Sequence, residues 1–204
     1  MSIENKIKET VDLFPTEWDE IVKRAELLSS LDYSYEQVKK EFEVNEHKIT
    51  YYGDNDGAGN SMVLLLNNET QEALFIGFDH ESNLNFFARE QEEALIQFAM
   101  YETTPTSFLD VIVNQEETYE LLNVKNPVNG DTIWDASVVV VYKDGKWEPT
   151  PNYVKTAVDE DDDGGISYVS DSFTFNGDFE EWKQELLEDP EEHVEKAIAK
   201  YEQK

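Results

Sequence analysis

The sequence predicts an α+β fold in which an antiparallel β-sheet is flanked by N-terminal, central and C-terminal helices. Short runs rich in β-branched and aromatic residues are separated by tight turns, a pattern typical of an antiparallel meander. Segments with apolar residues at helical spacing lie before, between and after these runs. The 204 residues fit one domain, because a single core serves chains of up to about 250 residues. We expect N-terminal helices over residues 1–44, the sheet and further helices over 45–177, and C-terminal helices over 178–204.

The N-terminal part of the chain carries two helical patterns. Apolar residues recur at helical spacing within residues 16–31, at Trp18, Ile21, Val22, Ala25 and Leu28. Thr16 is placed to cap this helix at its N-terminus. A second helix is predicted from Ser34, because Ser34 and Gln37 have the spacing of a capping box, and Val38 and Phe42 then share a face.

Three β-rich runs and two helices are predicted next. The runs cover residues 47–52, 61–67 and 73–79. The turns between them are short and rich in Gly, Asn and Asp, so we expect consecutive antiparallel pairing. Residues 90–101 then show helical spacing, and Pro105 is placed as the first residue of a helix that runs to about residue 113.

A hairpin is the clearest local signal in the second half of the chain. Residues 133–142 predict one strand, which Asp144 and Gly145 connect to a strand at Trp147. Asp-Gly tolerates the positive φ angles of a type I′ turn.

The last part of the chain predicts one strand and two helices. The strand covers residues 166–175. Asp178 is placed to cap the first helix, with Glu181 at the capping-box position, and Asp189 and Pro190 begin the second.

The charge of the chain favours a basic protein partner. There are 46 acidic and 16 basic residues, a formal net charge of −30, while aromatic residues make up 12% of the chain. Acidic disordered proteins lack such aromatic residues, so we expect a folded protein. A negative field repels nucleic acid and anionic membranes and accelerates association with positively charged proteins.

Other features of the composition bear on the compartment. The chain has no cysteine, which excludes disulfides, thiolate nucleophiles and cysteine metal sites. The first ten residues do not resemble a secretory signal, and the longest apolar stretches, residues 62–66 and 138–142, are far shorter than the roughly 20 residues of a membrane helix. We therefore expect a cytoplasmic protein that does not bind membranes.

An acidic loop at residues 159–165 is a candidate cation site. Asp159, Asp161 and Asp163 match positions one, three and five of an EF-hand calcium loop, and Gly164 matches position six. Ser170 stands where the bidentate Glu of that loop is expected. The competing interpretation is a solvated acidic turn, which is itself suited to contact with a basic partner. No other cofactor is predicted.

The acidic loops beside the sheet are the predicted partner-binding residues, because protruding loops commonly carry recognition. They are Asp54, Asp56, Asp159, Asp161, Asp162 and Asp163. The turn that contains Asp54 and Asp56 is rich in glycine but lacks the Lys and the glycine spacing of a phosphate loop.

A possible catalytic group is the sequence Asp79, His80 and Glu81, in which a His is flanked by carboxylates. No second His lies at metal-ligand spacing, and no known catalytic motif is present. We therefore interpret His80 and Ser82 as residues that form hydrogen bonds at the end of a strand, and we predict that the protein is not an enzyme.

Acidity, small size, lack of cysteine and the α+β pattern together resemble the acidic immunity proteins of bacterial polymorphic and contact-dependent toxin systems. Residues 74–82, LFIGFDHES, and the later hairpin of residues 138–147 are also similar to uncharacterised bacterial proteins. The resemblance implies an immunity protein, or antitoxin, that binds and occludes a toxin domain, such as a nuclease, without performing chemistry. Two alternatives stay open at this point, which are a calcium- or cation-binding acidic protein and a nucleic-acid mimic. The oligomeric state does not follow from the sequence.

Overall fold

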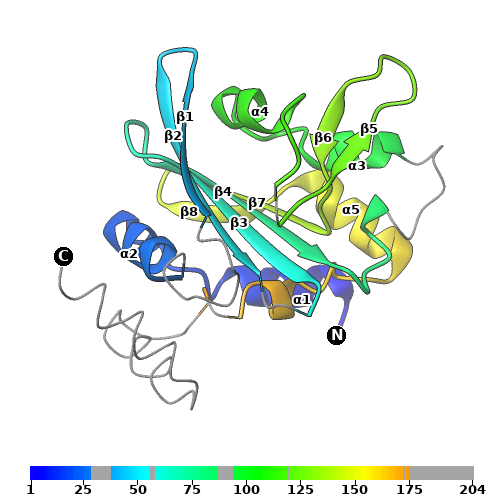
Figure 1. The fold of residues 1–204 in the computed structure, drawn as a ribbon. Helices are drawn as coiled ribbons and strands as arrows, with labels where there is room; N and C mark the ends of the chain where they lie inside the picture. The colour runs from blue at the N-terminus through cyan, green and yellow to red at the C-terminus, as the bar shows by residue number, and fades with distance from the viewer. Residues whose placement is uncertain (29–37, 56–57, 87–93, 119, 172, 175–204) are drawn as a thin grey trace.

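A computed structural model describes residues 1–28, 38–55, 58–86, 94–118, 120–171 and 173–174. Six strands form one antiparallel sheet in the order β1-β2-β3-β4-β7-β8. Their bounds are β1 Val38–Val44, β2 His47–Asn55, β3 Asn60–Asn67, β4 Glu72–Asp79, β7 Val138–Lys143 and β8 Lys146–Pro149. Helices pack on both faces (Figure 1), which confirms the predicted α+β fold.

The predicted meander is confirmed as β2, β3 and β4, whose registers run without interruption. The predicted hairpin is confirmed as β7 and β8, joined by Asp144 and Gly145 with φ angles of 53° and 79°. Both angles belong to a type I′ turn, whose twist matches that of the flanking strands.

The predicted strand of residues 133–142 is wrong as a single element. Ile133 and Trp134 belong to β6 (Thr132–Trp134), which pairs with β5 (Asn123–Lys125) in a separate sheet. The chain changes sheets at Asp135, whose buried carboxylate accepts hydrogen bonds from the backbone of Phe86. This side chain fixes a bend between two runs that look continuous in the sequence.

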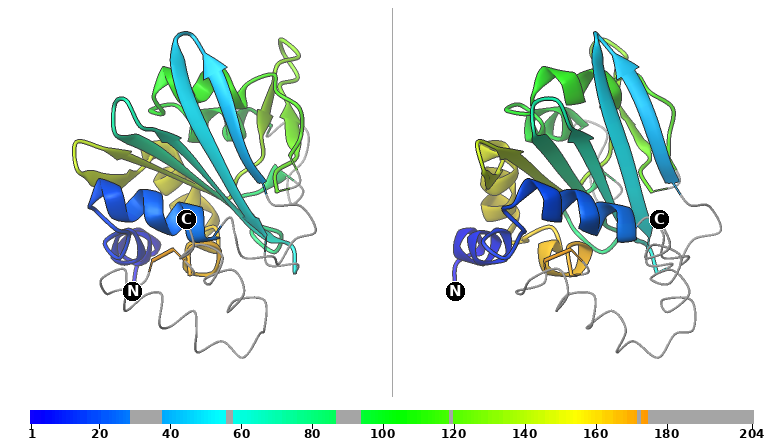
Figure 2. Two further views of the ribbon diagram at one scale, coloured as in Figure 1. Left: turned by 60° about the vertical axis from the view of Figure 1, so that its left-hand side comes forward. Right: turned by 90° about the vertical axis from the view of Figure 1, so that its left-hand side faces the viewer.

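Helices and the small sheet cover the two faces of the main sheet (Figures 1 and 2). Helices α1 (Ile3–Val11), α2 (Trp18–Leu28) and α6 (Ile166–Val169) lie on one face. On the other lie α3 (Ala94–Met100), α4 (Thr106–Ile112) and the β5–β6 pair, with α5 (Pro151–Glu160) beside them. The predicted helix of residues 16–31 is confirmed as α2, and the predicted helices at 90–101 and 105–113 are confirmed as α3 and α4.

An aromatic cluster forms the core beneath α1. Phe14 packs edge-on against Phe75 and Trp147, with ring centroids 5.1 and 5.2 Å away. Phe173 stacks on Phe75 at 6.1 Å. Edge-to-face and offset geometries are favoured by the quadrupoles of the rings, so this cluster joins the chain ends of the described structure to the central strand β4.

Two further elements contradict the sequence predictions. Residues 38–44 form strand β1 rather than the end of a helix from Ser34, because they pair with β2 over the whole strand. Residues 166–169 form helix α6 rather than a strand, and Ser170 Oγ donates to the Ile166 carbonyl oxygen at 2.6 Å. The predicted helices that begin at Asp178 and Asp189 lie outside the described residues, as does the start of the helix from Ser34.

Two further helices have caps that the sequence analysis missed. Ser2 caps α1 by accepting from the Asn5 backbone, and Ile7 of this helix is fully buried. Thr150 caps α5 by accepting from the Tyr153 backbone, with Pro151 in the first turn. In the part of the chain that the structure describes, no helix is both long and apolar enough to cross a membrane.

Candidate functional site

The acidic loop begins where α5 ends. Asp161 caps the helix in the left-handed conformation, with φ of 55° and ψ of 38°, and its side chain is exposed. The Asp162 backbone N–H then donates to the Ala157 carbonyl at 3.0 Å. The helix end therefore turns the chain back toward the sheet at the first residues of the loop.

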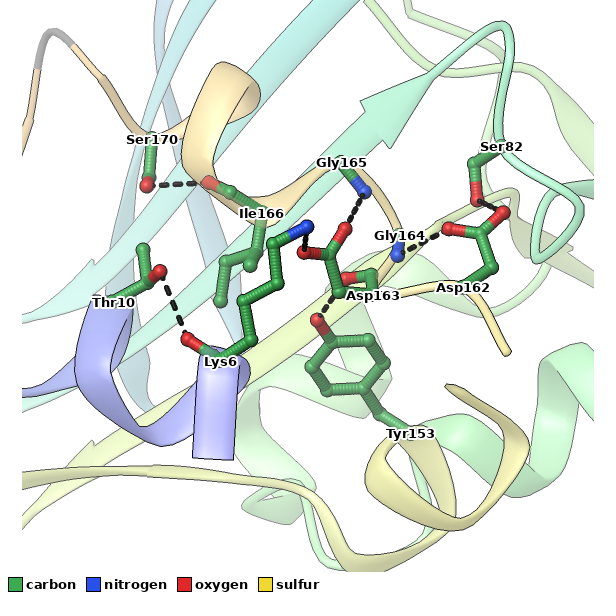
Figure 3. A network of polar contacts seen from close by, with 10 residues as sticks. All are labelled: Lys6, Thr10, Ser82, Tyr153, Asp162, Asp163, Gly164, Gly165, Ile166 and Ser170. Carbon is green, nitrogen blue, oxygen red and sulfur yellow. Dashed lines mark hydrogen bonds and ion pairs between the residues drawn. The ribbon is translucent and has the colours of Figure 1, made fainter. Parts of the chain in front are cut away.

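Asp163 points into the protein rather than into solvent. The residue is only 7% exposed, and its Oδ2 atom lies 2.5 Å from Lys6 Nζ on α1 (Figure 3). Its Oδ1 atom accepts from the Gly165 backbone, and its carbonyl oxygen accepts from the Tyr153 hydroxyl at 2.5 Å. The hydrogen bond to Asp163 raises the pKa of Lys6, so Lys6 carries its positive charge at neutral pH.

Asp162 ties the loop to the connection that follows β4. Its Oδ2 atom accepts from Ser82 Oγ at 3.2 Å and its Oδ1 atom accepts from the Gly164 backbone (Figure 3). The Oδ2 atom also accepts from the Asn83 backbone at 2.7 Å. Both Asp162 and Asp163 thus stabilise the fold. These roles could not be predicted from the loop sequence, because Lys6, Ser82 and Asn83 lie far away along the chain.

Two glycines allow the loop to pack closely. Gly164 and Gly165 have φ angles of 75° and 70°. A Cβ atom at Gly164 would overlap the Ser137 carbonyl oxygen, and one at Gly165 would overlap the Asp79 carboxylate. The loop can therefore approach the ends of β4 and β7 only with glycine at both positions.

Asp159, Glu160 and Asp161 are the exposed carboxylates of the loop, and the side chains of Asp159 and Asp161 have no ion-pair or hydrogen-bond partner among the described residues. Asp54 lies at the same end of the sheet and is half-buried, with its Oδ1 atom accepting from the Asn55 backbone. Asp56 lies outside the described residues. The predicted binding residues therefore divide into exposed ones and ones held inside the fold.

The arrangement of the EF-hand-like positions differs from a cation cage. Asp159 lies on the last turn of α5, Asp161 caps that helix, and Asp163 is held by Lys6. No group of three or more His, Asp or Glu residues in the described part of the chain is arranged to hold a metal ion. A cation at this loop would have to displace Lys6 before Asp163 could become a ligand.

His80 lies on the surface at the end of β4, and its Nδ1 atom is 3.4 Å from Asn60 Oδ1. The Asp79 carboxylate accepts from the Glu81 backbone at 2.9 Å, and Ser82 Oγ accepts from the Leu84 backbone at 3.0 Å. These are hydrogen bonds at the end of a strand, as the sequence indicated.

A buried pair that the sequence analysis missed lies on the opposite face of the sheet. The Tyr51 hydroxyl donates to Glu120 Oε2 at 2.5 Å, and Glu120 is only 5% exposed. Burial, followed by the charge of Glu120, raises the pKa of Tyr51 far above its ordinary value. Gly53 leaves room for this carboxylate, since a Cβ atom there would lie 2.6 Å from Glu120. No local motif marks Glu120, so only the fold reveals the pair.

A surface cavity of about 500 Å³ lies between the β7–β8 hairpin and the connection from α3 to α4. Lys143 and Lys146 line it, together with Thr103 and Glu148. Lys143 is paired with Glu72 at 3.0 Å and Lys146 with Glu148 at 2.7 Å. The charges of this cavity are therefore balanced, and its lining carries no nucleophile beside a general base.

Comparisons with known proteins give no family. No family model matches the chain, and neither a curated protein nor a solved structure is significantly similar to it. The resemblance to immunity proteins stays a prediction from the sequence.

Proposed function

We propose that this chain is a binding protein that neutralises a basic partner protein, as an immunity protein or antitoxin occludes a toxin domain. The observation that carries the proposal is the uncompensated negative charge of a folded surface. The formal net charge is −30, and several of the few lysines are already paired with carboxylates of the same chain: Lys6, Lys8, Lys39, Lys48, Lys143 and Lys146. The excess carboxylates are available to attract a cationic surface.

The contact surface that we propose is the end of α5 together with α6. Asp159 and Asp161 are exposed there, and α6, which follows the loop directly, carries Tyr168 with 77% of its surface exposed. The Tyr168 backbone N–H donates to the Gly165 carbonyl oxygen at 2.8 Å, so the residue follows the last glycine of the loop by one helical turn. Exposed Tyr residues within a polar rim are frequent binding hot spots. Asp159 and Asp161 would speed association, and Tyr168 would slow dissociation.

The partner can be isolated with the tagged protein as bait in its native lysate, at low and moderate salt, with mass spectrometry of the retained proteins. A single stoichiometric basic protein that survives moderate salt would support the proposal. A salt-labile mixture of basic proteins would contradict it, because general acidity alone produces that result.

The contact surface is tested by association kinetics with the isolated partner. The double variant Asp159→Lys, Asp161→Lys should slow association about tenfold or more and flatten its salt dependence, since charges near an interface act on encounter. Glu69→Lys, on the turn between β3 and β4 at the other end of the sheet, is the control for a change of charge away from the proposed contact, and it is compared per substitution because it changes the net charge half as much. Equal effects of both would place the contact elsewhere.

A further inference from the structure

Within the described residues, the outer edge of β1 carries a row of backbone groups that pair with no other strand. β1 is the outermost strand of the main sheet and pairs with β2 alone (Figure 2). A two-residue turn connects the strands, and its residues Asn45 and Glu46 have φ angles of 47° and 71°. In such a hairpin the flanking residues, Val44 and His47, form a hydrogen-bonded pair, and the bonding alternates from there.

The alternation fixes which groups of β1 face outward. The register from Val44 back along the strand has no bulge. The backbone N–H and C=O groups of Lys39, Glu41 and Glu43 therefore point away from β2, and none of them bonds to another described residue. An edge of this kind is a template for another strand.

The opposite edge of the sheet differs from β1. β8 has only four residues, ends at Pro149, and is held to the α1–α2 connection by a bond from Trp147 Nε1 to the Pro15 carbonyl at 2.8 Å. Short strands and proline are features that protect an edge. Of the two edges of the main sheet, the β1 edge is therefore the one that is suited to pair with another strand.

We propose that two copies of this chain pair antiparallel through their β1 edges, centred on Glu41, so that two sheets join into one. The occupant follows from the sequence of the strand, VKKEFEV. In this register Lys39 lies opposite Glu43 of the partner subunit, and two-fold symmetry repeats the pair. Each opposed residue pair exchanges two backbone hydrogen bonds, and opposite charges directly across strands stabilise the pairing.

The charges of β1 would normally prevent such pairing, because like charges at an edge repel a second strand. Here the signs at symmetric positions are opposite, so the barrier is absent. Only Glu41 meets its own copy, and Lys48 Nζ lies 2.8 Å from its carboxylate on the adjacent strand. Lys39 Nζ already lies 3.5 Å from Glu26 Oε1 on α2 and 5.3 Å from the centre of the Tyr52 ring, and Glu43 of the partner subunit would join these contacts on the same face of the sheet.

The net charge of each copy sets the conditions for the dimer. Two molecules of charge −30 repel one another over roughly a Debye length, which is about 8 Å at 0.15 M ionic strength and about 30 Å at 0.01 M. Association should therefore be visible near physiological ionic strength and weaken in very dilute salt. Capture of a basic partner has the opposite salt dependence, because it weakens as salt is added. The inference therefore goes beyond the proposed function, and either of the two can be wrong while the other is right.

Sedimentation velocity of the full chain at 0.15 M salt, over a range of protein concentrations, tests the proposal. The wild type should convert from monomer to dimer as its concentration rises. Glu43→Lys places a lysine opposite Lys39 in both symmetry-related pairs, and this repulsion should raise the dissociation constant of the dimer about tenfold or more. The double variant Lys39→Glu, Glu43→Lys restores both pairs with the net charge of the wild type, and should dimerise again.

A mixture gives an independent readout. Glu43→Lys and Lys39→Glu should each dimerise weakly alone and form a tighter heterodimer when mixed, because the pairs between them are complementary. A wild type that stays monomeric at every concentration would overturn the proposal, as would dimerisation unaffected by Glu43→Lys. Amide exchange supplies a second test that needs no variant. Protection of the Glu41 and Glu43 amides should rise with concentration, and protection that is independent of concentration would show that the chain covers its own edge.

Discussion

Lys6 Nζ lies 2.5 Å from Asp163 Oδ2, so the first helix of the chain closes over a loop near the other end of the described structure. The contact gives the acidic loop a structural role. Asp163 is almost fully buried, while about half of the Lys6 side chain is exposed to solvent. The pair therefore anchors α1 to the loop and lowers the cost of a buried carboxylate.

Lys6→Met should destabilise the protein by about 1–3 kcal/mol, because it leaves the buried Asp163 carboxylate without its cation. Solvent screening around the half-exposed Lys6 places the expected value below that of a fully buried pair. Urea unfolding measures the change. Lys8→Met is the matched control, since Lys8 pairs with Asp12 on the exposed surface of the same helix, where ion pairs contribute about 0–1 kcal/mol. Equal losses would show that Lys6 adds no more than a surface charge.

Gly164→Ala should destabilise the fold by about 3 kcal/mol or more, because the new Cβ atom would overlap the Ser137 backbone at a φ angle that disfavours side chains. Gly145→Ala is the control. Gly145 also has a positive φ, of 79°, but nothing lies within 4 Å of a Cβ there, so backbone strain alone should cost about 1 kcal/mol. Thermal unfolding of both variants separates the two effects, and similar values would contradict close packing at Gly164.

The strands that the sequence predicted correctly have local signals. Asp144 and Gly145 mark their turn because few residues accept positive φ angles. β1 was missed because Val38 and Phe42 are four residues apart, a separation that places residues on one face of a helix and also on one face of a strand. α6 was missed because Ile166 and Val169 are β-branched and favour strands, while the double glycine before them turns the chain.

The site was less predictable than the fold. The sequence identified the acidic loop but assigned all four of its aspartates to partner binding, whether exposed or buried. Asp159 and Asp161 are exposed, whereas Asp163 is buried against Lys6 and Asp162 holds the residues after β4. Such differences depend on contacts between distant segments, which neither composition nor spacing encodes.

Tyr51→Phe should destabilise the protein by about 2–3 kcal/mol, because it removes the donor from the buried Glu120 carboxylate. The double variant Tyr51→Phe, Glu120→Gln should recover part of this loss, since a neutral amide costs less to bury than an unpaired charge. Chemical denaturation of the wild type, the two single variants and the double variant gives the interaction free energy between the two side chains. Additive losses would mean that the hydroxyl and the carboxylate do not interact.

The buried tyrosines predict loss of stability in alkali. Burial raises the pKa of Tyr51, Tyr101 and Tyr153 above the ordinary value of 10.0. Above pH 10 the unfolded chain loses these protons while the folded chain keeps them, so the unfolded state binds fewer protons and stability falls as pH rises. The pKa of Lys6 is also raised in the folded state, so deprotonation of this lysine lowers stability further as the pH rises above 10.5. Absorbance at the tyrosinate band should rise cooperatively together with loss of circular dichroism, and smooth titration of every tyrosine in the folded state would contradict this.

Calcium should not bind the acidic loop at submillimolar concentrations, because Asp163 is held by Lys6 and Ser170 occupies the place of the closing acid. Isothermal calorimetry of the wild type measures this directly. Lys6→Met releases the Asp163 carboxylate and should bind calcium more tightly than the wild type. Saturable binding by the wild type that Asp161→Asn abolishes would overturn the expectation and favour a cation-responsive protein, because it would show that the loop exchanges an internal lysine for a metal ion.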